Sequence, residues 1–396
     1  MGMWGNPSGD LPDFALPPTI PDMANTYDIC IRGAGIVGRA LALLLARERL
    51  RVALVAPAGV TPSAASGHGD VRAYALNAAS RGLLESLRCW PDEAAATPVL
   101  RMAVHGDDGG VVNFDASAQA SPALTWIVDV PALEARLAEA VRYQPQIEVL
   151  EAPAPAALTV VCEGKASRTR AEFGVEFDAR PYSQNAIATR LSCEKPHGQT
   201  AWQWFSNGEI LAFLPLDGPQ GNSVAVVWSV QQERSSALLA TSPEEFTSML
   251  ETASHHTLGK LTLLGERASW PLQLARADRW VGPGWALAGD AAHTVHPLSG
   301  QGLNLGLADA AELARVLKSR EYWRTPGDLK LLRRFERARK ADVLSTSLAT
   351  DSLQQLFSLA GSPAQILRNL GMSGFDRSGP LKQWVARRAM GMAPTI

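Results

Sequence analysis

A glycine-rich turn near the start of the chain constrains the fold more than any other feature. Residues 27–32 are mostly apolar, residues 39–49 have a helical pattern, and residues 51–55 are apolar again. Strand, glycine turn, helix and strand in this order predict a βαβ unit. The turn itself reads Gly33-Ala34-Gly35-Ile36-Val37-Gly38.

The three glycines of this turn have the GxGxxG spacing of dinucleotide-binding proteins. Gly33 permits the tight turn, Gly35 lets the backbone approach a pyrophosphate, and Gly38 permits close packing of helix on strand. The phosphates then lie at a helix amino terminus, where free N–H groups favour negative charge. We predict dinucleotide binding; the alternative is an ordinary tight turn. One part of the fingerprint is missing, because Ala56 stands where an acidic residue would hold the adenosine ribose.

A second and more specific signal follows the short apolar run at residues 285–288. An aspartate directly after a strand accepts hydrogen bonds from sugar-like hydroxyls, and a glycine turn at a helix start offers backbone N–H groups to developing negative charge. A reduced flavin ring needs that arrangement. The motif reads Gly289-Asp290-Ala291-Ala292-His293-Thr294-Val295-His296-Pro297-Leu298-Ser299-Gly300-Gln301-Gly302-Leu303-Asn304.

Composition excludes several classes of protein. With 396 residues, 46% of them hydrophobic, the chain is long enough for a buried core and two or three domains. The formal net charge of -2 gives no general reason to bind nucleic acid or an anionic membrane. Four cysteines without paired spacing argue against a disulfide framework or a zinc site, so we expect a cytosolic protein.

The sequence indicates neither a membrane span nor a secretory signal. No stretch of about 18 uncharged apolar residues occurs. Residues 1–26 contain five prolines and no lysine or arginine. We therefore expect a disordered tail over residues 1–25, and we place the native start of translation at Met23, just before the first strand.

The motifs resemble those of the group A flavoprotein aromatic hydroxylases, and more closely the branch that acts on polyprenylated phenols in ubiquinone biosynthesis. The resemblance extends from about residue 27 to residue 392 and is most complete over residues 289–304. Besides the turn at 33–38, the matching stretches are Asp70-Val71-Arg72-Ala73-Tyr74-Ala75-Leu76-Asn77, Glu194-Lys195-Pro196-His197 and Phe335-Glu336-Arg337-Ala338-Arg339-Lys340-Ala341-Asp342.

The resemblance implies a non-covalently bound FAD, with its pyrophosphate near Gly35 and Arg72 and its ribityl chain on Asp290. Reduced nicotinamide, NADH or NADPH, would dock transiently, since no second glycine fingerprint exists, and O2 would then form a flavin hydroperoxide that hydroxylates an aromatic ring. From the residues alone, a lone arginine such as Arg72 is more often a surface charge. The resemblance places the flavin ring beside Pro297 and the turn Gly300-Gln301-Gly302-Leu303-Asn304.

The implied fold class is α/β: a Rossmann-like FAD-binding domain, an inserted antiparallel β-sheet substrate domain and a helical C-terminal region. Short β-rich runs between residues 182 and 228 predict the inserted sheet. Helical patterns cover residues 77–87, 131–143 and 301–317. We expect FAD-binding segments at 26–100, 125–180 and 279–325, substrate-side strands at 101–124, the substrate domain at 181–278 and the C-terminal helical region at 326–396.

Three departures from the family pattern adjoin the flavin domain. Residues 128–131 lack an arginine that the family often places there, residues 144–161 are too short for its usual hairpin, and Glu163 replaces an aspartate. Glu163 either contacts flavin or nicotinamide or lies in an exposed loop. Besides a working hydroxylase, the departures leave two alternatives: a non-catalytic scaffold subunit of a quinone-biosynthesis complex, and a flavin-dependent reductase. The altered signature reads Cys162-Glu163-Gly164-Lys165-Ala166-Ser167-Arg168-Thr169-Arg170.

Pro297 and His197 are the candidate catalytic residues. His197 would relay a proton to substrate, although a histidine beside a proline is more often structural. His293, His296 and Asp290 lack further ligands at zinc spacing, so no metal is predicted.

The expected partners are a lipophilic phenol or other quinone precursor, O2, and proteins of a quinone-biosynthesis complex, with no nucleic acid. Trp384 lies among basic residues in segment 381–388. That pattern fits either peripheral contact with the inner face of a membrane or a solvated terminal helix.

Overall fold

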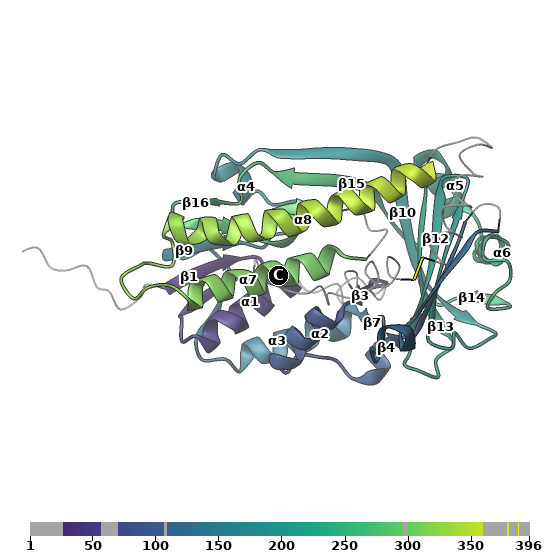
Figure 1. Cartoon of the computed structure of the whole chain (residues 1–396), viewed down its shortest axis with the longest axis horizontal. Coiled ribbons are helices and arrows are strands. Elements are labelled where there is room, and N and C mark those ends of the chain that lie inside the picture. The colour runs from purple at the N-terminus through teal and green to yellow at the C-terminus, as the bar shows by residue number, and fades with distance from the viewer. Residues whose placement is uncertain are drawn as a thin grey trace, which may run out of the picture.

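The computed structural model describes residues 27–56, 70–106, 109–295, 300–358, 378–379 and 387. A six-stranded sheet lies under several helices, a nine-stranded sheet stands at the other end of the molecule, and a small three-stranded sheet lies between them (Figure 1). The predicted tail at 1–25, Met23 and Trp384 fall outside the described residues.

The six-stranded sheet carries the first glycine turn. Its strands are β1 (Tyr27–Arg32), β2 (Val52–Val55), β8 (Ile147–Leu150), β9 (Ala156–Val161), β16 (Val281–Gly282) and β17 (Trp285–Leu287). The order is β16-β17-β9-β1-β2-β8, with β1 parallel to both β2 and β9. β2 is buried along its whole length, as expected of an inner strand in a covered parallel sheet.

Four helices pack side by side against this sheet, and their apolar residues form the main hydrophobic core with it. α1 (Ile36–Arg47) packs between α3 (Val130–Arg142) and α7 (Gly302–Lys318), and α7 packs against α8 (Leu329–Ser358) (Figure 1). α2 (Ala78–Ser86) starts where the Asn77 side chain accepts the Ser80 N–H, which caps the helix. The predicted helices at 77–87, 131–143 and 301–317 agree with α2, α3 and α7.

The nine-stranded sheet is built mostly from the middle of the chain. Its order is β18-β15-β10-β13-β12-β11-β5-β6, and β14 pairs with β10. α5 (Gln232–Ala240) and α6 (Pro243–Ala253) cover one face, where Trp228, Phe246 and Leu250 share a core. The strands are β5 (Arg101–His105), β6 (Val111–Asp115), β10 (Phe177–Cys193), β11 (Thr200–Ser206), β12 (Glu209–Leu216), β13 (Ser223–Gln231), β14 (Leu261–Leu263), β15 (Ala268–Ala277) and β18 (His293–Thr294).

The three-stranded sheet joins the two larger sheets. β7 (Thr125–Asp129) lies between β3 (Ala73–Leu76) and β4 (Ala96–Val99). Val99 and Ile127 of this sheet pack with Ala201, Leu216 and Ala225 of the large sheet. The face of the large sheet opposite α5 and α6 is therefore turned toward the glycine turns. Short helices complete the fold: η3 (Glu93–Ala95), η4 (Ser117–Gln119), α4 (Thr169–Glu172) and η5 (Gly289–Ala291).

Candidate cofactor site

The first glycine turn leaves open backbone at the start of α1. Gly33 has φ +114°, and a Cβ there would lie 2.5 Å from the Cys162 carbonyl oxygen. A Cβ on Gly38 would lie 1.9 Å from the Gly33 oxygen. Gly35 is the N-cap residue of α1, so no side chain forms a capping hydrogen bond there. A Cβ on Gly35 would meet nothing within 4 Å. The turn thus combines unpaired N–H donors with free space, which suits a phosphate group.

The other predicted residues of this turn are packing groups. Ile36 is buried and Ala34 is half-buried in the main core. Val37 fits between two glycines of other segments: a Cβ on Gly306 would lie 2.8 Å from Val37 Cγ2, and one on Gly289 would lie 3.5 Å from it. Val37 therefore joins α1 to α7 and to the end of the strand that precedes Asp290.

The second glycine turn forms the start of α7. Gly300 has φ +60°, and a Cβ there would lie 3.2 Å from the Ala75 side chain. Gln301 caps α7 without a side-chain bond to its backbone, and a Cβ on Gly302 would meet nothing within 4 Å. No acidic residue lies in the first turn of α7. The positive end of this helix dipole is therefore not neutralised from within the helix. Pro297 lies outside the described residues.

The buried Asn304 side chain holds this second turn in place. Its Nδ2 donates to the Ala75 oxygen at 2.8 Å, and its Oδ1 accepts the Asn77 N–H at 3.0 Å and the Ser80 hydroxyl at 2.7 Å. The side chain is buried, with these partners around its amide. Asn304 thus ties α7 to β3 and α2, and Leu303 beside it is half-buried against the main core.

Asp290 lies in the short helix η5, three residues after the end of β17, and is exposed. The protein atoms around it raise its pKa by desolvation, which the nearby His293 and Lys165 charges oppose. Desolvation also raises the pKa of Tyr74, which senses the charges of Arg72 and Asp290. An exposed carboxylate with no hydrogen-bond partner among the described residues is available to the hydroxyls of a ligand.

A buried polar network stands behind Asp290. Asp309 Oδ2 accepts the Gly289 N–H at 2.9 Å and lies 2.7 Å from His293 Nε2, while Arg339 Nε donates to Asp309 Oδ1 at 2.8 Å. Burial alone would raise the pKa of Asp309, but His293 and Arg339 bring it below its usual range. Asp309 therefore holds the turn that presents Asp290. No motif pointed to Asp309 or to its pairing with Arg339.

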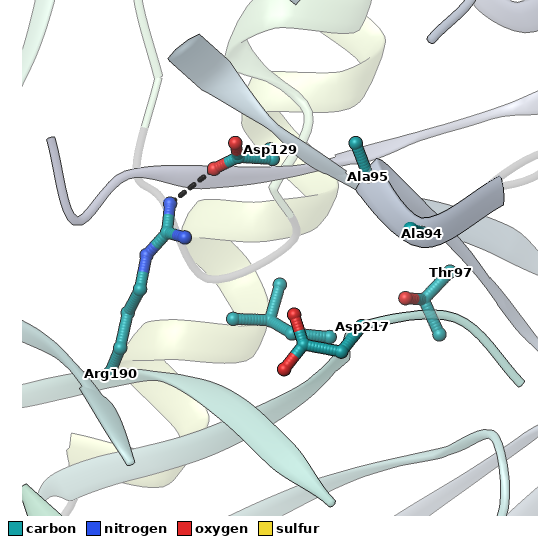
Figure 2. A pocket seen from close by; sticks show the side chains of 7 residues that line it. Ala94, Ala95, Thr97, Asp129, Arg190 and Asp217 are labelled. Atoms are coloured by element: carbon teal, nitrogen blue, oxygen red, sulfur yellow. Dashed lines mark hydrogen bonds and ion pairs between the residues drawn. The ribbon is translucent and has the colours of Figure 1, made fainter. Parts of the chain in front are cut away.

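Arg72, directly before β3, is held by an ion pair and by the large sheet. Its Nε and Nη2 donate to Asp70 at 2.9 and 2.5 Å, and this bonding raises its pKa. From β10, Arg190 Nη2 donates to the carbonyl oxygens of Asp70 and Arg72 at 3.0 and 3.3 Å, and it pairs with Asp129 (Figure 2). A cavity of about 180 Å³ lies beside the Arg190–Asp129 pair. Arg190 thus supplies a bridge that the sequence did not predict.

In the altered third signature, Glu163 forms hydrogen bonds with later residues of the same segment. Both carboxylate oxygens of Glu163 accept hydrogen bonds, from the Ser167 hydroxyl at 2.7 Å and the Thr169 hydroxyl at 2.7 Å, and Arg32 Nε lies at 3.3 Å. Desolvation would raise the Glu163 pKa, but these bonds lower it below its usual range. Arg170 is buried and donates to the Ala291 oxygen at 3.0 Å. Contact of Glu163 with a cofactor stays a prediction, and these contacts weigh against it.

The His197 ring also forms hydrogen bonds with the backbone. Its Nε2 lies 2.7 Å from the Leu216 oxygen, and its Nδ1 accepts the Gln199 N–H at 3.0 Å. Desolvation lowers the pKa of the buried ring. His197 ties the loop after β10 to the end of β12, and a catalytic role for it stays a prediction.

The described residues fit FAD. Two helix starts offer uncapped N–H groups over open glycines; the second lies on the element that packs against the exposed Asp290, and the partly exposed Arg72 guanidinium adds a positive charge. These donors suit a pyrophosphate, a charged ring and a polyol chain. Within the described ranges, no group of three His, Cys, Asp or Glu side chains is placed to hold a metal ion.

Comparison with known proteins defines the class of protein. The family model described as an FAD binding domain matches residues 151–344. The structure of PqsL from Pseudomonas aeruginosa in complex with 2-aminobenzoylacetate matches with a TM-score of 0.71 at 21% identity, over 84% of this chain and 97% of that one. The p-nitrophenol 4-monooxygenase PnpA from Pseudomonas putida also gives 0.71, at 20% identity, over 92% and 96%. The fold is that of FAD-dependent monooxygenases, and the predicted α/β class is confirmed.

Curated relatives define the family more narrowly. The chain is 31% identical over 390 residues to the 3-demethoxyubiquinol 3-hydroxylase of Escherichia coli, covering 92% of this chain and 98% of the relative. It is 32% identical over 414 residues to the ubiquinone hydroxylase UbiL of Rhodospirillum rubrum, covering 98% and 94%. The chain belongs to the ubiquinone-biosynthesis family of FAD-dependent hydroxylases. The predicted resemblance is confirmed, and the scaffold and reductase alternatives are not favoured.

No helix in the described part of the chain is both long and apolar enough to cross a membrane.

Proposed function

We propose that this protein uses reduced nicotinamide and O2 to hydroxylate the aromatic ring of a lipophilic, polyprenylated quinone precursor. The observation that carries the proposal is the pair of open helix starts at Gly35 and Gly302, together with relatives named for ubiquinone hydroxylation. When bound, FAD supplies hydride acceptance and oxygen activation.

The protein's own part is to bind, orient and exclude water. The N–H groups at the start of α1 and the Arg72 guanidinium hold the phosphates, and Asp290 accepts hydrogen bonds from the ribityl hydroxyls. The start of α7 stabilises negative charge on the flavin ring, with the turn fixed by Asn304. The face of the large sheet opposite α5 and α6 shields the ring site from water.

The first test is the chromophore and the reaction of the purified protein. We expect released FAD near one equivalent per chain, and NAD(P)H oxidation that increases when a prenylated phenol is added. Oxygen from labelled O2 should appear in the phenol. NAD(P)H oxidation that yields only hydrogen peroxide with every phenol tried would contradict the proposed hydroxylation.

A genetic test separates catalysis from a scaffold role. In a strain that lacks this gene and accumulates an unhydroxylated phenol, the wild-type gene should restore the quinone and Asp290→Ala should not. Asp92→Ala, which changes an exposed aspartate that pairs with Arg136 on α3, is the matched control and should restore it. Full rescue by Asp290→Ala at equal protein level would favour the scaffold.

A further inference from the structure

Arg39 in the first turn of α1 is a half-buried cation without a protein partner. Among the described residues, no carboxylate lies within 4.0 Å of its guanidinium and no acceptor forms a hydrogen bond with it. Desolvation lowers its pKa, and only the more distant Glu134 charge opposes this. The other α1 arginine, Arg47, donates to Ser86 instead. A partly desolvated charge without a partner costs stability, which a bound anion would offset.

The position of Arg39 on α1 brings it near the predicted pyrophosphate site. Its N–H donates to the Gly35 oxygen at 2.9 Å, so it lies one turn after the open glycine. Helical side chains lean toward the helix amino terminus, which directs the long Arg39 side chain back along this turn. α1 has no acidic residue in its first turn to compete for the guanidinium.

Arg72 and Arg39 share a neighbouring carboxylate. Its Nη2 lies 3.9 Å from Glu134 Oε1 on α3, and Glu134 is also the carboxylate that acts on Arg39. Because α1 and α3 pack together, the shared Glu134 carboxylate brings the two guanidinium groups into the same neighbourhood. Arg72 is 42% exposed, and Asp70 binds its guanidinium through Nε and Nη2, so the exposed part of the guanidinium remains accessible to a ligand.

The end of β2 explains why a second cation is needed there. Ala56 has no side chain that accepts a hydrogen bond, and its N–H is used by the Leu150 oxygen at 2.8 Å. The adenosine ribose therefore loses the carboxylate contact that dinucleotide-binding folds usually provide. An additional charge-assisted bond to the adjacent phosphates compensates for that loss.

We propose that Arg39 and Arg72 bind the FAD pyrophosphate together, and that Arg39 takes over the share of affinity that an acidic residue at position 56 would contribute. The inference rests on the proposed function only in requiring FAD. Glu134 then competes with the pyrophosphate for both arginines and lowers FAD affinity.

The test measures flavin affinity on the apoprotein, not turnover. Arg39→Gln should raise the Kd for FAD by about ten- to a hundredfold, the effect of one charge-assisted bond, and should leave riboflavin, which has no phosphate, within about twofold. Arg142→Gln removes an exposed arginine from the end of α3 and is the matched control; it should change neither Kd. Fluorescence quenching of each flavin during titration gives the constants.

Glu134→Gln makes the inference sharper because its effect has the opposite sign. Removing the competing carboxylate should tighten FAD binding by a few fold, and Arg39→Gln combined with Glu134→Gln should fall between the single variants. Added salt should weaken FAD binding less in Arg39→Gln than in wild type, because one charge pair has been removed.

Three results would overturn the inference: an unchanged FAD affinity in Arg39→Gln, an equal loss of riboflavin affinity, or weaker FAD binding in Glu134→Gln. Thermal melting of each apoprotein tells a folding defect from a binding defect. Failure of wild type to bind FAD would instead overturn the cofactor assignment, so the two failures are distinguishable.

Discussion

The two helix starts at the candidate site are built in opposite ways. At α1 the turn is shaped by close backbone contact: a Cβ on Gly38 would lie only 1.9 Å from the Gly33 oxygen, which leaves no room for any side chain. At α7 the turn is held by buried polar side chains: Asn304 binds β3 and α2, and Asp309 binds the Gly289 N–H.

The difference matches what each turn is proposed to hold. A pyrophosphate needs donors and free space, which missing side chains provide without burying polar groups. A flavin ring needs a fixed orientation, and a fully bonded buried network gives rigidity at a desolvation cost. We therefore expect substitutions that add atoms to disrupt the first turn, and substitutions that remove polar atoms to disrupt the second.

The largest effect should come from adding a methyl group to the first turn. In Gly38→Ala, the new Cβ meets backbone that cannot rotate away, so α1 must move off β1 and the core between them. We expect a loss of at least about 5 kcal/mol in the free energy of unfolding, measured by urea denaturation, or no soluble protein.

Gly35→Ala is the matched control for that substitution. Its Cβ would meet nothing within 4 Å, and the backbone φ of -76° suits alanine. The apoprotein should stay within about 1 kcal/mol of wild type, while FAD affinity falls because the methyl group occupies the approach of the phosphates. If Gly35→Ala and Gly38→Ala lower the free energy of unfolding equally, the two glycine positions do not differ in the room that they leave for a side chain.

The local parts of this contrast could be predicted from the sequence. The β1–α1–β2 unit follows from the GxGxxG turn, and α2, α3 and α7 each begin and end within one residue of the predicted bounds. These signals are short in range: a cap at Asn77, a proline at the start of α3 and a glycine before α7. The candidate glycines lie at two helix starts for the same reason.

The long-range polar pairs could not be predicted. Arg190 and Asp129 are 61 residues apart, and Asp309 and Arg339 are 30 apart, so no local pattern joins them. One signal was present: Asp309 lies between Leu305 and Leu313 on the buried stripe of α7. A single charge in an apolar stripe requires a buried partner, although the pattern alone does not name it.

Removing the charge of Asp309 should give the next largest effect. Asp309→Asn leaves Arg339 and His293 facing an amide, and breaking one partner of a buried pair costs about 3–5 kcal/mol. The Gly289 turn should loosen with it, so FAD affinity should fall as well. Denaturation of the apoprotein and flavin titration measure the two effects separately; a loss of stability with unchanged FAD affinity would show that the network does not hold the turn.

The pH dependence of this variant has a definite sign. The pKa of Asp309 is lower in the folded protein than in the unfolded chain, so its contribution is present above about pH 4 and is lost as pH falls toward the folded pKa. The difference in unfolding free energy between wild type and Asp309→Asn should therefore be largest above about pH 5 and narrow below pH 4. A difference that widens in acid would contradict an ionised Asp309.

Asn304→Ala, which removes the side-chain amide that ties α7 to β3 and α2, should have a smaller effect than Asp309→Asn. The substitution leaves the Asn77 N–H, the Ser80 hydroxyl and the Ala75 oxygen without their partner, at a cost of about 2–3 kcal/mol. Ser80→Ala removes only one of these bonds and should cost about 1 kcal/mol. Because Asn304 also holds the N–H groups at the start of α7 in their orientation, the reduction potential of bound FAD should fall in Asn304→Ala and stay near wild type in Ser80→Ala. If both variants shift the potential equally, the orientation of the second turn depends on packing and not on this clamp, and the contrast between the two helix starts disappears.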